Sequence, residues 1–280
     1  MELLQLAYFC DAAETQNFSK TAKKYNVPPS NISQSVKRLE TELEVTLFER
    51  TANRVALSER GRVFYTDVKR ALTILERSRD ALYNGEDEGC LKINIQVSRR
   101  LAMEAIEKFQ ACFPRVDIVT RHEPETDPME FDLVVTDKRL NADDLVCTEA
   151  VSEDIVIAFK RGLLSENNIT ADDLKNKPFI TMNAGNSLYE ATREICGDMG
   201  FAPRIALQSE DPLYVRKCIE LGLGVAFVPS YSWRGEFSSE VVLKKIGEYT
   251  RHIYVYRRNG NHLPSYLIAL YEMLVQEYAK

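Results

Sequence analysis

The sequence predicts an α/β chain with a helix-rich N-terminal part, and three observations carry this prediction. Residues 3–43 repeat apolar side chains at three- and four-residue spacing, which is typical of amphipathic helices. A proline-free run from Ser58 to Tyr83 continues that spacing. After Gly89, short apolar runs alternate with amphipathic stretches, a pattern typical of a parallel or mixed sheet with helices on both faces.

Composition sets the broad class of protein. The chain has 280 residues, of which 45% are hydrophobic and 28% charged, enough for at least two domains with their own cores. No apolar run approaches the ~20 residues of a membrane span, and the acidic start MELLQLAYFCDAAE is unlike a signal peptide. We therefore expect a cytoplasmic protein with no membrane partner. The six cysteines are scattered without a C-x-x-C pair, which favours reduced, mostly buried thiols.

Charge is unevenly distributed along the chain. Residues 1–84 contain 13 Lys+Arg and 11 Asp+Glu, whereas the remaining residues contain 23 and 31. Within residues 20–70 there are 11 basic and 6 acidic side chains. Such a local positive excess attracts polyanions even though the net charge of the whole chain is −6.

Two helices are predicted before residue 27. The first has one apolar face made by Leu3, Leu6, Ala7, Phe9, Cys10 and Ala13. The second is predicted to begin with Ser19 as its cap and to turn Ala22 and Tyr25 inward, leaving Lys20 outside. Asn26 tolerates a left-handed backbone, so a tight turn is expected there.

A third helix is predicted to begin at Pro28 and Pro29, whose missing N–H groups are not needed in a first turn. Its inner side carries Ile32, Val36, Leu39 and Leu43. Its outer side carries groups that can bind base edges or phosphates: Ser30, Asn31, Ser33, Gln34, Lys37 and Arg38. Two short helices, a turn and this polar face predict a helix-turn-helix. The alternative is an ordinary solvated helix face.

The run from Ser58 to Tyr83 predicts one long helix. Phe64, Val68, Ala71, Leu75, Ser78 and Leu82 alternate spacings of four and three. This is a heptad seam, whose apolar pairing residues are Phe64, Val68, Ala71, Leu75 and Leu82. A helix of roughly 40 Å is too long to bury its edge within a small domain, so pairing with a second copy is expected. Packing on its own N-terminal domain is compatible with this near Val63 and Phe64. NGEDEGC then predicts a stop and a flexible joint.

The segment NFSKTAKKYNVPPSNISQSVKRLETELEVTLFERTANRVALSERG resembles the N-terminal domain of LysR-type transcriptional regulators. The matching residues are Phe18, Ala22, Val27, Ile32, Ser33, Arg38, Leu39, Glu40, Leu43, Leu47, Phe48 and Arg50. The resemblance implies a winged helix-turn-helix whose wing, RTANRVALS, brings Arg50 and Arg54 to phosphates or the minor groove. The chain departs from the family pattern at Pro29, Ser30, Gln34 and Glu44, which bears on the operator sequence rather than the fold.

The C-terminal two-thirds resemble the effector domain of the same family. The strand CLKINI, the segment FDLVV and above all ELGLGVAFVPSY carry this likeness. It implies two α/β lobes like those of periplasmic binding proteins, joined by two crossing strands. The expected organisation is a DNA-binding domain over 1–58, a linker helix and hinge over 59–89, and a regulatory domain over 90–280. Lobe I would take about 90–150 and 252–280, and lobe II about 151–251.

A small effector is expected between these lobes, near two strand-to-helix turns. One turn carries Ser98, Arg99 and Arg100, and the other carries Asn183, Asn186 and Ser187. Either arginine could clamp a carboxylate, so an anionic effector is a candidate. The alternatives are helix capping for the serines and plain surface charge for the arginines.

No catalytic or metal-binding pattern is found. His122, His252 and His262 are far apart and lack metal-ligand spacing, and no G-x-S-x-G or G-K-[ST] motif occurs. No cofactor, metal or enzyme activity is therefore expected.

The overall expectation is a homodimeric regulator of double-stranded operator DNA that responds to a small effector and can contact the transcription machinery. Bases would be read by Ser30, Asn31, Ser33 and Gln34; phosphates would be held by Lys20, Lys37, Arg38, Arg50 and Arg54, with Ser19 nearby. Assembly into a homotetramer through the lobes is also expected. Two rival interpretations are a ligand-binding protein whose N-terminal helices only oligomerise, and an α/β enzyme with an accessory helical domain.

Overall fold

The computed structural model describes residues 1–51, 54–83, 88–141, 143–260 and 263–279. The side chains at positions 50, 51, 54, 77 and 80–83 lie outside this description. The chain divides into two compact units, Met1–Gly89 and Cys90–Lys280, and each is described by itself.

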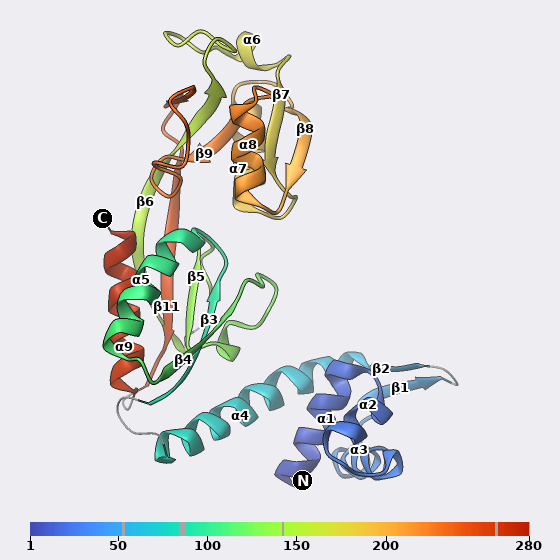
Figure 1. The fold of residues 1–280 in the computed structure, drawn as a ribbon. Coiled ribbons are helices and arrows are strands. Elements are labelled where there is room, and N and C mark those ends of the chain that lie inside the picture. The colour runs from blue at the N-terminus through green and yellow to red at the C-terminus, as the bar shows by residue number, and fades with distance from the viewer. Residues whose placement is uncertain (52–53, 84–87, 142, 261–262, 280) are drawn as a thin grey trace. The chain divides into compact units, whose positions relative to one another are not determined.

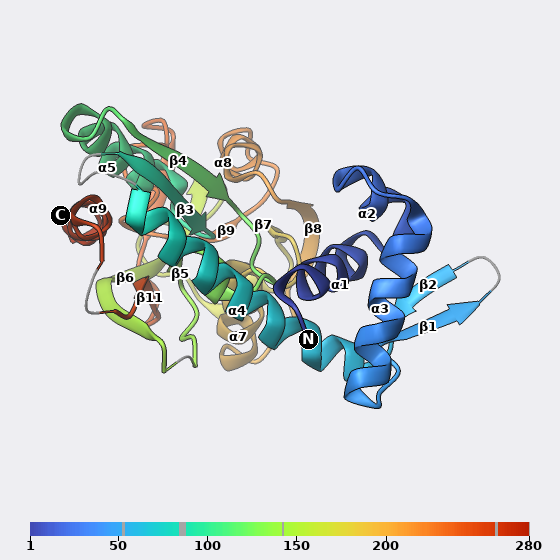
Figure 2. The ribbon, with the colours of Figure 1, turned by 90° about the horizontal axis from the view of Figure 1, so that it is seen from below.

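The first unit is helical with one small hairpin. Figure 2 shows its three short helices grouped together, with the hairpin projecting from them. In chain order its elements are α1 (Leu3–Thr15), α2 (Phe18–Lys24), α3 (Pro29–Leu43), β1 (Phe48–Thr51), β2 (Arg54–Leu57) and α4 (Glu59–Tyr83). The hairpin is antiparallel and pairs Phe48 with Leu57.

Aromatic side chains hold this unit together. Phe9 on α1 is fully buried, and its ring centroid lies 5.6 Å from that of Phe48 and 5.3 Å from that of Phe64. Each such burial contributes about 1.5–3 kcal/mol. Leu3, predicted to face inward, is 60% exposed, because α1 begins there and its first turn extends past the core. Ala12, which was not among the predicted inward residues, is fully buried.

The helix ends explain the turns of this unit. The cap of α2 is Asn17, not Ser19: the Oδ1 atom of Asn17 accepts hydrogen bonds from the backbone N–H groups of Ser19 and Lys20 at 3.0 and 3.1 Å. Ser19 lies inside the first turn, two residues after the cap position. Asn26 adopts a left-handed backbone with φ 53°, as predicted.

One carboxylate fixes the hairpin to the end of α3. The Oε1 atom of Glu40 accepts hydrogen bonds from Leu47 N at 2.8 Å and Phe48 N at 3.0 Å. The start of α4 packs against the same segment so closely that a Cβ on Gly61 would lie 2.1 Å from the carbonyl oxygen of Leu47. The wing strands are thereby anchored at their base.

The second unit contains two lobes joined by long strands (Figure 1). The first lobe has a mixed sheet with the strand order β6-β11-β5-β3-β4. Its elements are β3 (Gly89–Ile95), α5 (Arg99–Cys112), β4 (Val116–Arg121), a 3-10 turn (Pro128–Glu130), β5 (Leu133–Thr136), β11 (Thr250–Arg258) and α9 (Ser265–Tyr278). Strand β6 (Leu145–Lys160) runs through both lobes.

Among the residues that the structure describes, helices cover only one face of the first lobe, so the prediction of helices on both faces is wrong there. α5 and α9 pack together over one continuous core that includes Leu133 and Val255. On the opposite face, Tyr254 and Tyr256 pack with Phe131, Leu140 and Leu145 instead of with a helix. Tyrosines suit this face because their hydroxyls find partners at its edge; Leu140 N donates to Tyr256 Oη at 2.9 Å.

The second lobe has helices on both faces, as predicted. Its further elements are α6 (Ala171–Leu174), β7 (Pro178–Met182), α7 (Ser187–Asp198), β8 (Arg204–Ser209), α8 (Pro212–Glu220), β9 (Ala226–Pro229) and β10 (Val241–Lys244). One core buries Val215 and Ile219 of α8, and another buries Ile195 and Cys196 of α7. The short strand β10, which pairs antiparallel with β6, has no counterpart among the predicted elements.

Two strands cross between the lobes. The first half of β6 pairs with β11, and its second half pairs with β9 and β10. The ladder with β11 has one irregularity: Ile253 pairs with Val151 while Tyr254 pairs with Glu149, so Ala150 is an extra residue on β6. Such a bulge bends the strand and increases its local twist.

Candidate functional site

The outer face of α3 is a continuous polar surface. Five of its six predicted contact residues, Ser30, Asn31, Gln34, Lys37 and Arg38, are exposed, and Ser33 is half-buried. On the opposite side Ile32, Val36 and Leu39 are fully buried. A helix anchored in this way can present its polar side chains to a major groove about 12 Å wide.

Two further sets of predicted DNA contacts flank α3. Ser19 and Lys20 are exposed in the first turn of α2. Arg50 lies on β1 and Arg54 on β2, the two strands of the hairpin, but their side chains are outside the described residues.

The predicted seam of α4 divides into two parts. Val68 is only 7% exposed and packs, with Phe64, in the core of its own unit. Val63, also expected to pack there, is 65% exposed. Farther along, Ala71 is exposed and Leu75 is 48% exposed, next to Ile74 at 54%. The side chain of Leu82 and residues 84–87 of the predicted joint lie outside the described residues.

A cleft lies between the two lobes of the second unit. It contains two cavities of about 290 and 310 Å³ that share Gln96, Val97, Arg99, Met182, Asn186 and Glu210 among their lining residues. All six predicted effector residues line one or both: Ser98 and Arg100 the first, Asn183 and Ser187 the second, and Arg99 and Asn186 both. Residues from two sequence-distant turns therefore meet at one place.

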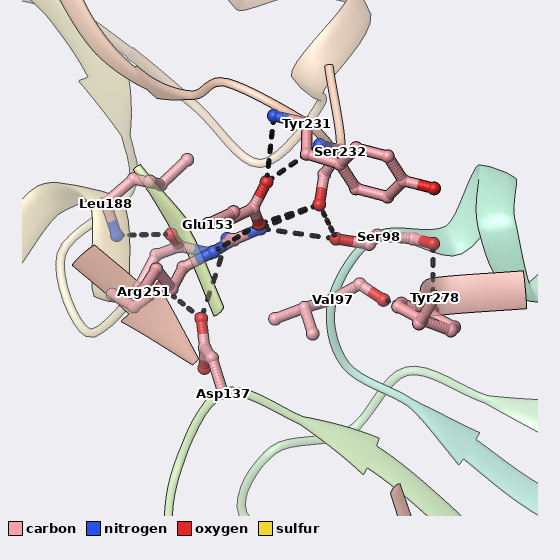
Figure 3. Close-up of polar contacts among 11 residues, drawn as sticks. Val97, Ser98, Asp137, Glu153, Leu188, Tyr231, Ser232, Arg251 and Tyr278 are labelled. Atoms are coloured by element: carbon pink, nitrogen blue, oxygen red, sulfur yellow. Dashed lines mark hydrogen bonds and ion pairs between the residues drawn. The ribbon is translucent and has the colours of Figure 1, made fainter. Parts of the chain in front are cut away.

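Hydrogen bonds join the lobes across this cleft (Figure 3). Ser98 donates to the Oγ atom of Ser232 at 2.8 Å. Ser187 bonds to the carboxylate of Asp137. Ser98 stands at the N-cap position of α5, but its hydroxyl makes no capping bond. The N-cap of α7 is Asn186, which accepts from Leu188 N at 3.0 Å, so the capping alternative is wrong for Ser187.

A buried ion pair between Arg251 and Glu153 adjoins the hydrogen bond between Ser98 and Ser232. Arg251 on β11 donates through Nη2 to Oε1 of Glu153 on β6 at 2.7 Å, and its Nη1 atom lies 3.6 Å from Oδ2 of Asp137. The Glu153 side chain is fully buried, and its Oε2 atom accepts from Tyr231 N and Ser232 N at 3.2 and 2.7 Å. Such multiple bonding compensates the desolvation of a buried charge.

Ser98 has an unusual backbone that the C-terminal helix supports. Its φ is 52°, a left-handed value uncommon for residues other than glycine. The hydroxyl of Tyr278 donates to the carbonyl oxygens of Val97 and Ser98 at 3.3 and 3.0 Å. Burial raises the pKa of this phenol above its ordinary value, so it remains a hydrogen-bond donor.

The two predicted arginines differ in their surroundings. Arg99 is exposed and forms no ion pair within the described ranges. Arg100 bonds to Glu104 one turn along α5, and its Nε atom lies 3.2 Å from Oε1 of Glu236. Arg99 can therefore offer its whole guanidinium fork to a ligand, whereas Arg100 already contacts carboxylates.

Several lining residues were missed from the sequence. Arg216 and Trp233 line the first cavity, and the Arg216 guanidinium lies 5.3 Å from the Trp233 ring. Glu153 and Arg251 stand 98 positions apart, so no local spacing links them. The one available signal was the charged pair Glu153-Asp154 directly before the apolar run IVIAF. Among the described residues, no group of three potential metal ligands and no membrane-spanning helix occurs.

Family models match both parts of the chain. Residues 84–279 match the LysR substrate binding domain, and residues 3–62 match the bacterial regulatory helix-turn-helix protein, lysR family.

Similar proteins cover nearly the whole chain. The HTH-type transcriptional regulator AlsR of Bacillus subtilis is 28% identical over 94% of this chain and 92% of its own length. The transcriptional dual regulator GltC of the same organism is 26% identical over 100% of this chain and 98% of its own length. The crystal structure of CbnR, a LysR family transcriptional regulator, has a TM-score of 0.67 at 21% identity and covers both chains fully. Full-length CbnR complexed with target DNA has a TM-score of 0.65 at 21% identity, covering 99% of this chain and 100% of its own.

Proposed function

The chain belongs to the LysR family of DNA-binding transcriptional regulators with an effector-binding domain, and on that premise we propose how its residues divide the work. The polar face of α3 reads bases through Ser30, Asn31, Ser33 and Gln34. Phosphates are held by Lys20, Lys37, Arg38, Arg50 and Arg54, with Ser19 beside them. The observation that carries this proposal is the exposure of the polar face of α3 above a fully buried apolar back.

We propose the domain division 1–58, 59–89 and 90–280, with a helix pair formed by two copies of α4. Because Val68 is buried within its own unit, the pairing surface is supported by the exposed apolar side chains beyond it, Ile74 and Leu75. A C2 pair of this kind places two α3 helices on two half-sites of one operator. Further assembly into a tetramer through the lobes is part of the same proposal.

The effector is proposed to bind in the cleft, where Ser98, Arg99, Arg100, Asn183, Asn186 and Ser187 meet. The combined cavities are of the size that a small metabolite needs. A ligand there competes with the bonds that now join the lobes, so its binding changes their relative angle. Transmission of that change to the DNA-binding helices is the proposed regulatory mechanism.

The relatives are regulators rather than enzymes, and we propose that this chain also performs no catalysis and acts in the cytoplasm on chromosomal DNA. Contact with the transcription machinery belongs to the same proposal. The interpretation in which the N-terminal helices serve only oligomerisation predicts no sequence preference at any salt concentration.

DNA selection from a random pool, followed by mobility shifts, tests the DNA-binding assignment. Lys37→Ala should weaken binding evenly across sequences and lower the salt slope by about one. Gln34→Ala should instead relax preference at one position, with a cost of roughly 1–3 kcal/mol. Lys175→Ala, an exposed lysine of the second unit, is the matched control and should change neither quantity. An unaltered salt slope in Lys37→Ala would remove the phosphate-contact assignment.

A further inference from the structure

One carboxylate in the first cavity is shared by two arginines from different lobes. Arg100 belongs to α5 of the first lobe, and Arg216 belongs to α8 of the second. The Oε1 atom of Glu236 lies 3.2 Å from Arg100 Nε, and its Oε2 atom lies 3.3 Å from Arg216 Nη2. All three residues line the same cavity.

The Glu236 contacts are loose for charged partners. Strong charge-assisted hydrogen bonds span about 2.7–2.9 Å, as between Arg251 and Glu153 at 2.7 Å. Both Glu236 distances are longer. In addition, the Nε atom of Arg216 is buried and has no hydrogen-bond partner among the described residues. The two guanidinium groups therefore retain donors that Glu236 does not use.

The arginine of the second lobe is better fixed than the carboxylate. The Arg216 side chain is 15% exposed and stacks on Trp233, which is 6% exposed. The Glu236 side chain is 30% exposed and follows Gly235, whose φ is 78° in a turn with open space around it. Movement of Glu236 into solvent thus disturbs little packing, whereas Arg216 stays in place to receive another anion.

Resting on the proposed function of the cleft, we propose that Arg100 and Arg216 form the anion subsite for the effector and that Glu236 occupies this subsite until an effector carboxylate displaces it. The ligand class is a small carboxylate, since the subsite already accommodates one carboxylate bridging two guanidinium groups. Glu104, Glu210 and Asp211 lie close to the same arginines or line the same cavity, and their negative charge disfavours a second anionic group beside Arg100 and Arg216.

Displacement of Glu236 also affects the buried ion pair between Arg251 and Glu153. The turn that carries Glu236 includes Tyr231 and Ser232, whose backbone N–H groups bond to Glu153 on the crossing strand β6. An effector that moves this turn therefore acts directly on the strand that joins the lobes.

Acetate is the simplest probe, and the single tryptophan, Trp233, reports the subsite. Full-length protein is titrated with acetate at constant ionic strength, with chloride replacement as the reference, and tryptophan fluorescence is recorded. Glu236→Gln should bind acetate at least tenfold tighter than the wild type, because the competing charge is gone. Glu240→Gln removes an exposed carboxylate four residues away and should titrate like the wild type. Adding Arg216→Gln or, separately, Arg100→Gln to Glu236→Gln should abolish the gain.

Two results would overturn the inference: acetate affinity in Glu236→Gln equal to that of Glu240→Gln, or a gain that survives either arginine substitution. Mobility shifts with the same proteins separate this outcome from failure of the proposed function. A flat acetate titration with intact operator binding refutes only the subsite. Absent operator binding in every protein, with the acetate gain preserved, refutes only the DNA-binding assignment.

Discussion

Removing the charge of Glu153 should destabilise the second unit more than any exposed substitution. Glu153→Gln keeps the size and one oxygen acceptor for the Ser232 N–H group, but its NH2 group replaces the Oε1 atom that accepts from Arg251, so the charge and one acceptor are lost together. It leaves Arg251, whose side chain is 8% exposed, with Asp137 at 3.6 Å as its one carboxylate partner among the described residues. The free energy of unfolding should fall as a result.

The magnitude follows from the pairing. Breaking a buried ion pair by removing one partner costs about 3–5 kcal/mol. The remaining Asp137 carboxylate and the retained amide oxygen place this case near the lower end, at about 3 kcal/mol. With an unfolding slope of about 3 kcal/mol per molar urea, the midpoint should fall by roughly 1 M.

Urea unfolding followed by the fluorescence of Trp233, the single tryptophan, measures this effect in the second unit. Arg251→Met should be destabilising too, and the double variant should lose less than the sum of the single losses by about 2 kcal/mol, because neither charge is then left alone. Lys175→Ala, which removes an exposed ion pair with Asp172, is the control and should leave the midpoint unchanged. Additive losses in the double variant would refute the assignment of Glu153 and Arg251 as an energetically coupled pair.

Three other predictions test separate parts of the chain. Gly61→Ala should destabilise the first unit by about 3 kcal/mol or more, since its Cβ would meet a backbone carbonyl oxygen at 2.1 Å. Gly197→Ala has open space within a helix and should stabilise the protein by about 0.5–1 kcal/mol. Circular dichroism during heating compares the two variants. Leu75→Glu should shift the protein toward monomer in sedimentation, and an unchanged dimer would remove α4 as the pairing surface. Burial raises the pKa of the Cys10 and Cys196 thiols to about 12 each, so the folded chain keeps protons that the unfolded chain releases near pH 8.5. The contribution of these thiols to the free energy of unfolding is fully present below that pH and is lost as pH rises toward 12. The urea midpoint should therefore decline less steeply in Cys10→Ala/Cys196→Ala than in the wild type between about pH 8.5 and 11.

The sequence predicted features that local spacing encodes. The buried side of α3, the left-handed turn at Asn26 and the proline start of α3 follow from periodicity and backbone preference alone. The two strand-to-helix turns are visible as changes of period, but their meeting at one cleft was implied by the resemblance to LysR-type regulators.

Features that depend on tertiary pairing were not visible. Glu236 lies in a turn with no pattern of its own, and its two arginine partners come from different helices. The covering of only one face of the first lobe is decided by where α9 returns, not by the amphipathicity of any helix. Even the capping error at Ser19 has this origin, because Asn17 and Ser19 are both good caps and only the backbone path selects Asn17.

The extra residue at Ala150 affects the relative orientation of the two lobes, but it does not line the cleft between them. Deleting Ala150 would restore a regular ladder in which Glu149 still faces Tyr254 and Val151 still faces Ile253. Every side chain that lines the cleft would be kept, yet β6 would run straighter and the angle between the two lobes would change. Deleting this one residue can therefore change the conformational response to the ligand without changing which ligand binds.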